Sequence, residues 1–248
     1  SNHKRSLNAS FRIAIADDLV RKNPFDFKLN EVIEDDRKPR QALTEEQEEK
    51  LLSFVRKDRV YQKYYDAIVI LLKTGLRISE LCGLTRQDID FENEVIHVNH
   101  QLLYSKEIGY YIETPKTKSG VRDVPMSEEV KQALKRIMAE RKKTEPIAID
   151  GYSGFLFLNG KGYPMTNAYY TVTFSNLTKK YNKYHEDSLP KITPHILRHT
   201  FCTRLANRNM NPKSLQYIMG HSNISITLNL YAHASAENVK AELKSMIA

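Results

Sequence analysis

Cysteine is nearly absent from this sequence, which has two among its 248 residues. Cys82 and Cys202 each have apolar neighbours at helical spacing. Small proteins that depend on disulfides use a much higher share of cysteine than this. We therefore exclude a disulfide framework and expect two buried free thiols in a reducing cytoplasm.

Long apolar runs are also missing. The longest of them, residues 67–72, is far shorter than the roughly 18 residues that a membrane-spanning helix needs. No signal peptide opens the chain, and neither an internal repeat nor a low-complexity tract interrupts it. We expect a cytoplasmic protein that has no membrane partner.

Acidic residues are outnumbered by basic ones. Lys and Arg total 38 and Asp and Glu total 30, so the net charge is +8. A basic excess favours a polyanionic partner such as nucleic acid, although charge alone does not decide this. Because 41% of the residues are hydrophobic, the chain can bury a substantial core.

The first 30 residues contain one amphipathic helix and little else. Apolar side chains at helical spacing predict a helix over residues 7–22, namely Leu7, Phe11, Ile15 and Val20. Asn23-Pro24 ends this helix, because the residue before a proline avoids the α region. Residues 31–43 form a charged linker. One helix cannot build its own core, so we interpret residues 1–30 as the end of another domain.

Residues 44–234 show the pattern of one mostly helical domain with a small sheet. Helical spacing and capping residues predict helices over residues 44–57, 61–74, 78–82, 169–184 and 213–219, and helices that start near Ser127 and Pro194. Alternation predicts three strands over residues 95–98, 110–114 and 121–124. The expected fold class is α+β, with one three-stranded antiparallel sheet.

Two arginines stand in settings that suggest phosphate chemistry. Arg77 follows the glycine that ends a helix, and Arg198 lies three residues after His195 on the same helix face. Guanidinium groups match phosphate oxygens in pairs and stabilise the charge that grows during phosphoryl transfer. For a single arginine a surface salt bridge is the more common role. The two settings together favour a site that acts on a phosphodiester.

The histidines near Arg198 also permit a metal site. His195 and His199 are four residues apart, as in some zinc-binding helices, but Ile196 occupies the position of the usual glutamate. No Cys-x-x-Cys pair or compact carboxylate cluster completes such a site. We expect neither a metal nor another cofactor, and we interpret His199 as a core histidine.

Tyr231 is one of 14 tyrosines, most of which are expected to pack or stack. It lies ten residues after His221, which follows Gly220. A phenol with a pKa near 10 needs nearby cations or a base to react at neutral pH. Arg77, Arg198 and the histidines supply that setting, which makes Tyr231 a candidate nucleophile.

Lys118 lies at the tip of a predicted hairpin. By pattern alone, a solvated or phosphate-contacting lysine is the simpler interpretation. A hairpin lysine can also reach a scissile bond and protonate the departing 5′ oxygen. Lys116 lies two residues earlier on the same side of the ribbon, so periodicity does not choose between the two lysines.

A different class of function fits part of the sequence. Residues 211–231 are similar to a helix-turn-helix with a glycine in its turn, which is typical of DNA-binding regulators. That interpretation leaves Arg77, Lys118, His195 and Arg198 without a role, so we rank it below an enzyme.

The motifs resemble those of the tyrosine recombinases, and within them the integrases of conjugative transposons and temperate phages. The resemblance covers residues 41–235 and rests on five segments: Thr-Gly-Leu-Arg-Ile-Ser-Glu-Leu (74–81), Lys-Thr-Lys-Ser-Gly-Val-Arg-Asp-Val-Pro (116–125), His-Ile-Leu-Arg-His-Thr-Phe (195–201), Leu-Gln-Tyr-Ile-Met-Gly-His (215–221) and Tyr-Ala-His (231–233). It implies a site-specific recombinase that cuts and rejoins DNA through a 3′-phosphotyrosyl intermediate.

The resemblance also implies roles for particular residues. A phosphate clamp is formed by Arg77, His195, Arg198 and His221. Lys118 acts as the general acid on the leaving 5′ hydroxyl, and Tyr231 acts as the nucleophile.

Further expectations from the resemblance concern domains and partners. Residues 1–30 correspond to the last helix of a core-binding domain, and residues 44–234 form the catalytic domain. The apolar stripe of residues 235–248 (Val239, Leu243, Met246 and Ile247) indicates a helix for docking on a neighbouring protomer. The implied partners are double-stranded DNA, a homo-oligomer of two to four protomers and a directionality factor. A type IB topoisomerase, which shares the chemistry, is the other enzyme that fits.

Overall fold

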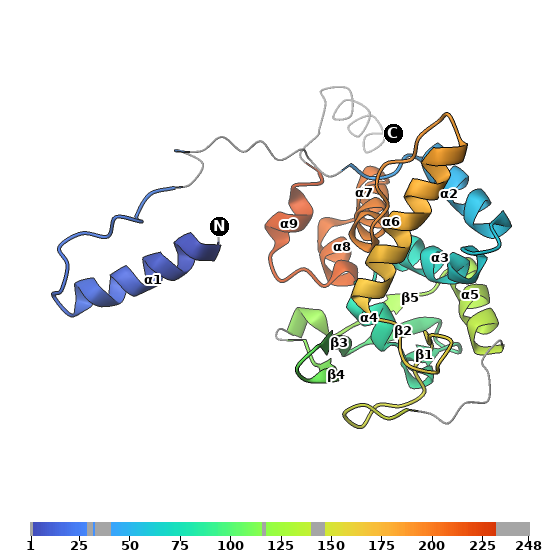
Figure 1. Cartoon of the computed structure of the whole chain (residues 1–248), viewed down its shortest axis with the longest axis horizontal. Coiled ribbons are helices and arrows are strands. Elements are labelled where there is room, and N and C mark those ends of the chain that lie inside the picture. The colour runs from blue at the N-terminus through green and yellow to red at the C-terminus, as the bar shows by residue number, and fades with distance from the viewer. Residues whose placement is uncertain (1, 29–31, 33–40, 116–117, 140–146, 232–248) are drawn as a thin grey trace, which may run out of the picture. The chain divides into compact units, whose positions relative to one another are not determined.

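The structure is a computed structural model that describes residues 2–28, 32, 41–115, 118–139 and 147–231, with only the backbone of Asn2 and Lys118. The chain forms two separate compact units, residues 1–40 and residues 41–248 (Figure 1). The predicted docking helix over residues 235–248 and most of the predicted linker lie outside the described residues.

The first unit contains α1 (Asn2–Ala16) and the segment that folds back beside it. The rings of Phe11 and Phe25 lie 5.3 Å apart, centre to centre. The predicted end of this helix at residue 22 is wrong. Asp18 adopts a left-handed conformation (φ 57°), which short polar side chains tolerate, and this ends the helix earlier. Two consecutive acidic residues are also unfavourable at the negative C-terminal end of a helix.

The second unit is mostly helical. Its helices are α2 (Glu45–Lys57), α3 (Tyr65–Thr74), α4 (Ile78–Gly83), α5 (Glu128–Ala139), α6 (Asn167–Tyr184), α7 (Pro194–Asn207), α8 (Pro212–Met219) and α9 (Ile224–Leu228), with short 3-10 turns over Gln62–Tyr64, Arg86–Asp88 and Lys118–Gly120. The capping side chains that the sequence predicted accept backbone N–H groups as expected at Thr44, Thr166, Thr193 and Asn211.

The core of this unit is built around α3. Residues 67–72 of this helix are all buried, as the apolar run predicted. The helix packs against α5 and against α7, which carries His195 and Arg198. Both cysteines, Cys82 and Cys202, are buried and free, as expected. Because α3 leads directly to Arg77, this packing fixes two of the predicted arginines relative to each other.

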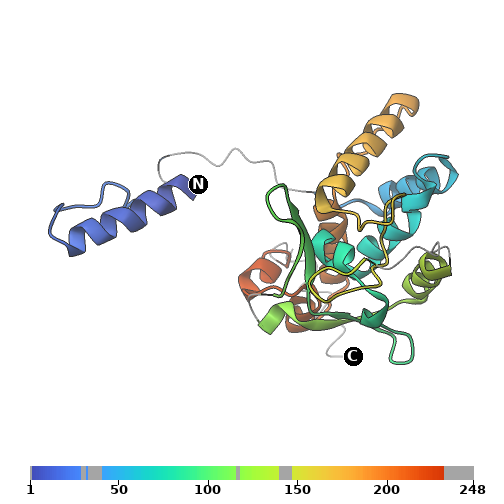
Figure 2. The same cartoon turned by 60° about the horizontal axis from the view of Figure 1, so that its bottom comes forward.

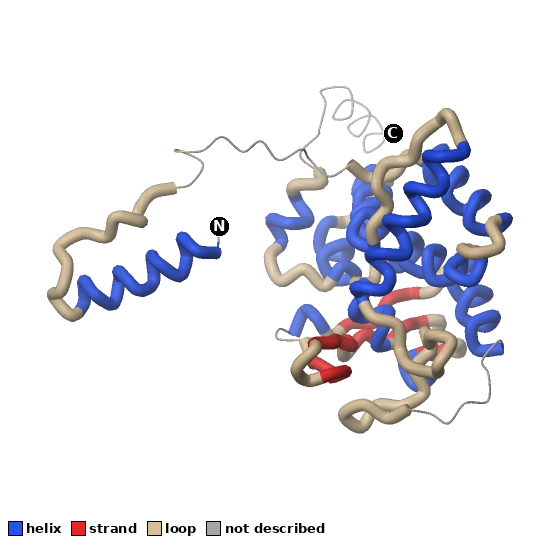
Figure 3. Tube along the Cα trace, viewed as in Figure 1, coloured by secondary structure: helices blue, strands red, loops and turns tan. Residues whose placement is uncertain are grey.

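The strands form two small antiparallel sheets, which lie in the lower part of this unit in Figure 3. The first contains β1 (Ile89–Asp90), β2 (Val95–Val98) and β5 (Arg122–Pro125), in the order β1-β2-β5. The second pairs β3 (Gln101–Ser105) with β4 (Gly109–Glu113).

The predicted membership of the three-stranded sheet was therefore wrong for one strand. Residues 95–98 and 121–124 correspond to paired strands, whereas residues 110–114 belong to the separate hairpin with β3. The reason is local. Gly109 has φ 83° and the hydroxyl of Ser105 accepts the N–H of Ile108 at 3.1 Å, so a tight turn pairs β4 with the strand just before it.

Helix α6 extends along one side of this unit, and its C-terminal half lies beside α2 (Figures 1 and 2). The Tyr181 ring meets Phe54 edge to face at 5.3 Å. Lys180 Nζ lies 2.6 Å from the Asp58 carboxylate, at the end of this contact. These contacts pack the C-terminal part of α6 against the end of α2.

Gly75 connects the core to the site and cannot be replaced by a larger residue. Its φ is 64°, and a Cβ atom built on it would lie 2.4 Å from Phe201 Cδ1. We predict that Gly75→Ala lowers the free energy of unfolding by about 1–3 kcal/mol, because the left-handed conformation and the close approach both oppose a side chain. Urea unfolding measures this.

The matched control is Gly160→Ala. A Cβ atom on Gly160 would have no other atom within 4 Å, and the residue has no left-handed φ. Its replacement is expected to change the unfolding free energy by less than about 0.5 kcal/mol. Equal effects of the two substitutions would contradict the explanation.

Candidate active site

The site is organised around the carboxylate of Glu80, in the first turn of α4. Arg77 precedes this helix in an extended conformation, and its backbone N–H donates to Glu80 Oε2 at 2.7 Å. Its guanidinium Nη1 donates to Glu80 Oε1, also at 2.7 Å. The carboxylate therefore fixes both the backbone and the side chain of the first predicted arginine.

A second arginine reaches the same carboxylate from β5. Arg122 is 2% exposed. It makes two parallel contacts with Glu80, from Nη1 to Oε1 at 3.0 Å and from Nη2 to Oε2 at 2.8 Å. Burial alone raises the pKa of Glu80, but the hydrogen bonds and charge of Arg122, with the charge of Arg77, outweigh it and lower the pKa to about 2. Glu80 is therefore ionised at neutral pH.

Glu80 and Arg122 were not among the predicted site residues. A signal for Arg122 was available, because residues of a strand alternate between faces and Arg122 therefore shares a face with the apolar Val124. Glu80 lies three residues after Arg77, which places the two side chains together at a helix start. Both positions were inside the quoted motifs, but their roles depend on contacts across elements.

The C-terminal end of α8 holds three arginines at once. Its last carbonyls accept hydrogen bonds from different guanidinium groups: Ile218 from Arg122 Nε at 2.6 Å, Met219 from Arg198 Nη2, and Gly220 from Arg77 Nη2 at 2.8 Å. Carbonyls at a helix C-terminus lack partners within the helix and carry partial negative charge. The carbonyls at this helix end therefore favour the binding of positively charged groups.

Arg198 is tied to a second helix end as well. Its Nη1 donates to the carbonyl of Gly75, the residue that caps α3, at 2.5 Å. The side chain is buried, and burial together with the nearby Arg77 charge lowers its pKa. Three guanidinium groups surround one carboxylate here, so positive charge is in excess. An anion that enters the site neutralises this excess.

His221 lies next to the arginines. It is half-buried, and its Nδ1 is 3.0 Å from the hydroxyl of Thr227 in α9. Burial, followed by the charges of Arg198, Arg77 and Arg122, lowers the pKa of His221 to about 4. The imidazole is therefore neutral at pH 7 and can act as a hydrogen-bond donor to an anion.

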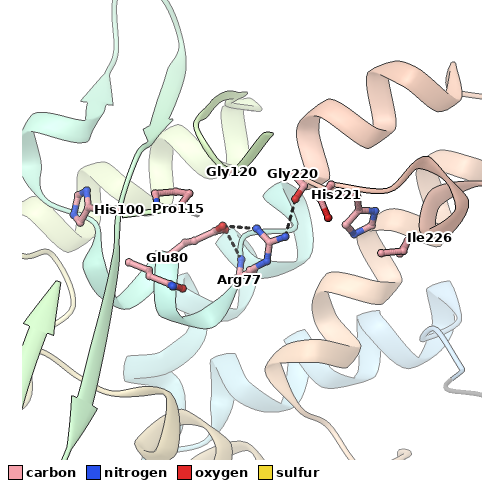
Figure 4. Close-up of a pocket in the computed structure, with 10 residues that line it drawn as sticks. Arg77, Glu80, His100, Pro115, Gly120, Gly220, His221 and Ile226 are labelled. Atoms are coloured by element: carbon pink, nitrogen blue, oxygen red, sulfur yellow. Dashed lines mark hydrogen bonds and ion pairs between the residues drawn. The ribbon is translucent and has the colours of Figure 1, made fainter. Parts of the chain in front are cut away.

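Arg77, Glu80, Gly220 and His221 line an open pocket (Figure 4). Arg77 lies between Glu80 and Gly220 in this view, with His221 beside it. The walls come from α4, β3, the segments on either side of Lys118, and the turn after α8; the residues that line it include Arg77, Gln101, Pro115, Gly120, Gly220 and His221. The pocket is therefore an open hollow that the guanidinium of Arg77 lines, with His221 beside it.

Two predicted residues lie at the margin of this arrangement. His195 is exposed in the first turn of α7, one turn before Arg198. The backbone of Lys118 lies in the 3-10 turn Lys118–Gly120, and its side chain is outside the described part of the structure. Of the six predicted residues, Arg77, Arg198 and His221 are brought together directly.

Tyr231 lies apart from these three. Its ring packs on a second small cluster that includes Cys202 and Met219, and its hydroxyl donates to the backbone carbonyl of Met210. Burial, and then the nearby Cys202 thiol, raise the pKa of Tyr231. In this conformation the hydroxyl contacts a carbonyl rather than an arginine, and the expectation that the arginines activate this phenol stays a prediction.

A metal centre and a membrane-spanning helix each need a particular arrangement of residues. Within the described ranges, no group of three or more His, Cys, Asp or Glu residues is arranged to hold a metal ion. None of the helices described is both long and apolar enough to cross a membrane.

The pKa of Glu80 predicts a pH dependence of stability. A carboxylate with a lowered pKa stabilises the fold above its unfolded pKa of about 4.5, and this contribution is lost as the pH falls towards about 2. We predict that Glu80→Gln removes most of the loss of stability between pH 4.5 and 2 and destabilises the protein at pH 7 by about 3–5 kcal/mol. Urea unfolding at a series of pH values measures both.

Glu92→Gln is the control, because Glu92 is exposed in the turn between β1 and β2. Its pH profile is expected to match that of the unchanged protein. A Glu80→Gln profile that keeps the same slope below pH 4.5 would show that other carboxylates carry the effect.

Comparison with known proteins places this site in a family. Residues 41–238 match the phage integrase family. The transposase of transposon Tn916 from Enterococcus faecalis is 63% identical over 246 residues, which cover 99% of this chain and 61% of that protein. The transposase of Tn1545 from Streptococcus pneumoniae has the same identity and coverage. The chain therefore spans about three fifths of the length of these relatives.

Solved structures agree with the sequence match. The Tn1549 transposon integrase, in complex with a circular intermediate DNA, is 61% identical with a TM-score of 0.94, over 99% of this chain and 78% of that one. XerA recombinase, at 21% identity and a TM-score of 0.61, shares the fold over 99% of this chain and 76% of its own. The predicted mostly helical α+β fold is confirmed, and the chain belongs to the phage integrase family of tyrosine recombinases.

Proposed function

We propose that this protein is a site-specific DNA recombinase that excises and integrates a mobile element in the cytoplasm. One observation carries the proposal: the guanidinium of Arg77 lines an open pocket beside His221, where the buried Glu80 carboxylate and the Gly220 carbonyl hold it, and the buried Arg122 and Arg198 bind the same helix end. Such a site fits the oxygens of a phosphodiester. The similar proteins, a transposase and a transposon integrase in complex with DNA, support it.

The chemistry assigned to the site is two transesterifications. The Tyr231 phenol releases its proton to solvent as its oxygen attacks the phosphorus, the bond to the 5′ oxygen breaks, and Lys118 supplies the proton to that leaving oxygen. Arg77, Arg198, His195 and His221 bind the phosphoryl oxygens. The 5′ hydroxyl of a partner strand then attacks the 3′-phosphotyrosyl bond and releases Tyr231. Each step exchanges one phosphate ester for another, so the bond energy is retained.

The position of Tyr231 adds a requirement to this scheme. Its hydroxyl donates to the Met210 carbonyl and packs away from the arginines. Attack on a phosphate held by Arg77 and His221 therefore requires this hydrogen bond to break. Tyr231 is linked to the site by a short stretch of chain. It lies three residues beyond the end of α9, and His221 contacts that helix through Thr227.

The nucleophile can be tested directly. Tyr231→Phe removes one oxygen, so it is expected to abolish the covalent protein–DNA adduct and to leave DNA affinity nearly unchanged. Nicked suicide duplexes trap the adduct, which a denaturing gel detects.

Tyr217→Phe is the matched control. Tyr217 is on α8 and is 54% exposed, and its hydroxyl accepts the backbone N–H of Asp123 at 3.2 Å. This variant is expected to form the adduct at the normal rate. An adduct that persists in Tyr231→Phe would remove Tyr231 as the nucleophile.

The same proposal includes a domain organisation. Residues 1–30 are the remnant of a core-binding domain, residues 31–43 a linker, residues 44–234 the catalytic domain, and residues 235–248 a helix that docks on a neighbouring protomer. The division of the chain after Arg40 into two compact units supports the boundary. The partners are double-stranded DNA, one to three further copies of the protein, and a directionality factor.

Truncation tests the docking helix. Because the segment starts four residues after Tyr231, its docking on another protomer would pull on the nucleophile and couple cleavage to assembly. Truncation after Ala234 in the full-length protein is expected to lower the formation of multimers on DNA and to change the cleavage rate, while binding to a single site survives. Native gels and light scattering measure this, and unchanged multimer formation would exclude docking in trans.

Two alternatives have distinct outcomes. A type IB topoisomerase rejoins the same strand, so strands from two differently labelled duplexes would never be joined. A helix-turn-helix regulator would bind DNA without forming an adduct. Helices α8 and α9 do follow each other across a short turn that contains Gly220, but the end of α8 binds the three arginines, which favours a role in the site.

A further inference from the structure

Gln101, at the start of β3, links two elements of the site. Its Oε1 accepts the hydroxyl of Ser79 on α4 at 2.7 Å, and its Nε2 donates to Glu113 Oε2 on β4, also at 2.7 Å. Both ends of the amide are therefore used. The side chain also lines the pocket beside Arg77.

The close approach of α4 to β3 makes this link possible. Gly83 ends α4, and a Cβ atom on it would lie 2.9 Å from the backbone nitrogen of Leu102. The helix therefore rests on the strand backbone without an intervening side chain. Ser79 is one turn earlier on the same helix face, which places its hydroxyl over Gln101.

Glu113 is the last residue of β4 and leads towards Lys118. After the strand, Pro115 meets Gly120 so closely that a Cβ atom on Gly120 would lie 2.3 Å from Pro115 Cβ. The carbonyl of Gly120 accepts Arg122 Nη1 at 3.2 Å. The residues before and after Lys118 are thus each connected to α4, one through Gln101 and the other through Arg122 and Glu80.

We propose that Gln101 is a positioning residue for the general acid: it fixes the end of β4, the strand that precedes Lys118 in the chain, relative to the helix that begins at Arg77. The inference rests on the proposed role of Lys118. A glutamine suits the task because its amide donates to the carboxylate of Glu113 and accepts from Ser79, which neither a carboxylate nor an alkyl group can do.

A substrate with sulfur at the 5′ bridging position separates this role from others. Sulfur leaves without protonation, so a defect in the general acid disappears with this substrate. We expect Gln101→Leu to slow cleavage of the ordinary phosphodiester by about 10²-fold, as misplacement of a reacting group does. With the sulfur substrate, its rate is expected to return close to that of the unchanged protein. Single-turnover assays use the full-length protein and nicked duplexes.

Three variants calibrate the assay. Lys118→Ala is expected to show the same rescue by sulfur, whereas Arg77→Ala is expected to remain slow with both substrates. Gln132→Leu is the matched control for the loss of a glutamine, because Gln132 Nε2 donates to Glu128 Oε1 at 2.7 Å on the exposed face of α5. It is expected to cleave both substrates normally.

The contacts of Gln101 provide a second comparison. Glu113→Gln keeps an acceptor for the Gln101 amide and is expected to retain most activity on the ordinary substrate. Glu113→Leu removes the acceptor and is expected to behave like Gln101→Leu, including rescue by sulfur. The affinity for a single DNA site, measured by gel shift, is expected to stay within about threefold of the unchanged protein for the Gln101 and Glu113 variants, because none of them removes a positive charge.

The outcomes are distinguishable. If Lys118→Ala is rescued and Gln101→Leu is not, Gln101 acts through Arg77 or touches the DNA itself, and the positioning role is overturned while the proposed function stands. If Lys118→Ala is not rescued, or Lys116→Ala is rescued in its place, the assignment of Lys118 fails and the role of Gln101 fails with it. Rescue of both Lys118→Ala and Gln101→Leu supports the proposal.

Discussion

The pairing of Glu80 with Arg77 and Arg122 is the interaction on which the site depends, because it joins the start of α4 to β5 through one buried carboxylate. A buried carboxylate is stable only when it stays paired, and the loss of one partner is far more costly than the loss of a surface ion pair. Two apolar side chains would hold these elements together equally well. A carboxylate also keeps the guanidinium of Arg77 aimed at the pocket, which an apolar contact cannot do.

The structure brings together three of the six predicted site residues and places Tyr231 apart from them. Arg77, Arg198 and His221 already lie together, whereas the Tyr231 hydroxyl contacts the Met210 carbonyl. The raised pKa of Tyr231 and the lowered pKa of His221 have a common cause in burial, which favours the neutral form of each. Both groups are neutral at pH 7.

Much of this fold could be predicted from local signals, and the parts that could not have identifiable causes. Capping residues at Thr44, Thr193 and Asn211 fixed helix starts, because caps depend on a few neighbouring residues. The pairing of β4 was missed since alternation does not identify a strand's partner. Arg77, Arg198 and His221 were identified from their motifs, whereas Glu80 and Gln101 were not. Their roles come from contacts between elements, Glu80 with Arg122 on β5 and Gln101 with Ser79 on α4.

Because three arginines bind the C-terminal end of α8, the position of this helix end sets the position of all three guanidinium groups. Because Ile218, Met219 and Gly220 are consecutive, any small displacement of this helix end carries Arg122, Arg198 and Arg77 in the same direction. Thermal motion then shifts the whole set together and changes the spacing between its members little. The relative geometry of the three guanidinium groups therefore tolerates fluctuations of the surrounding protein.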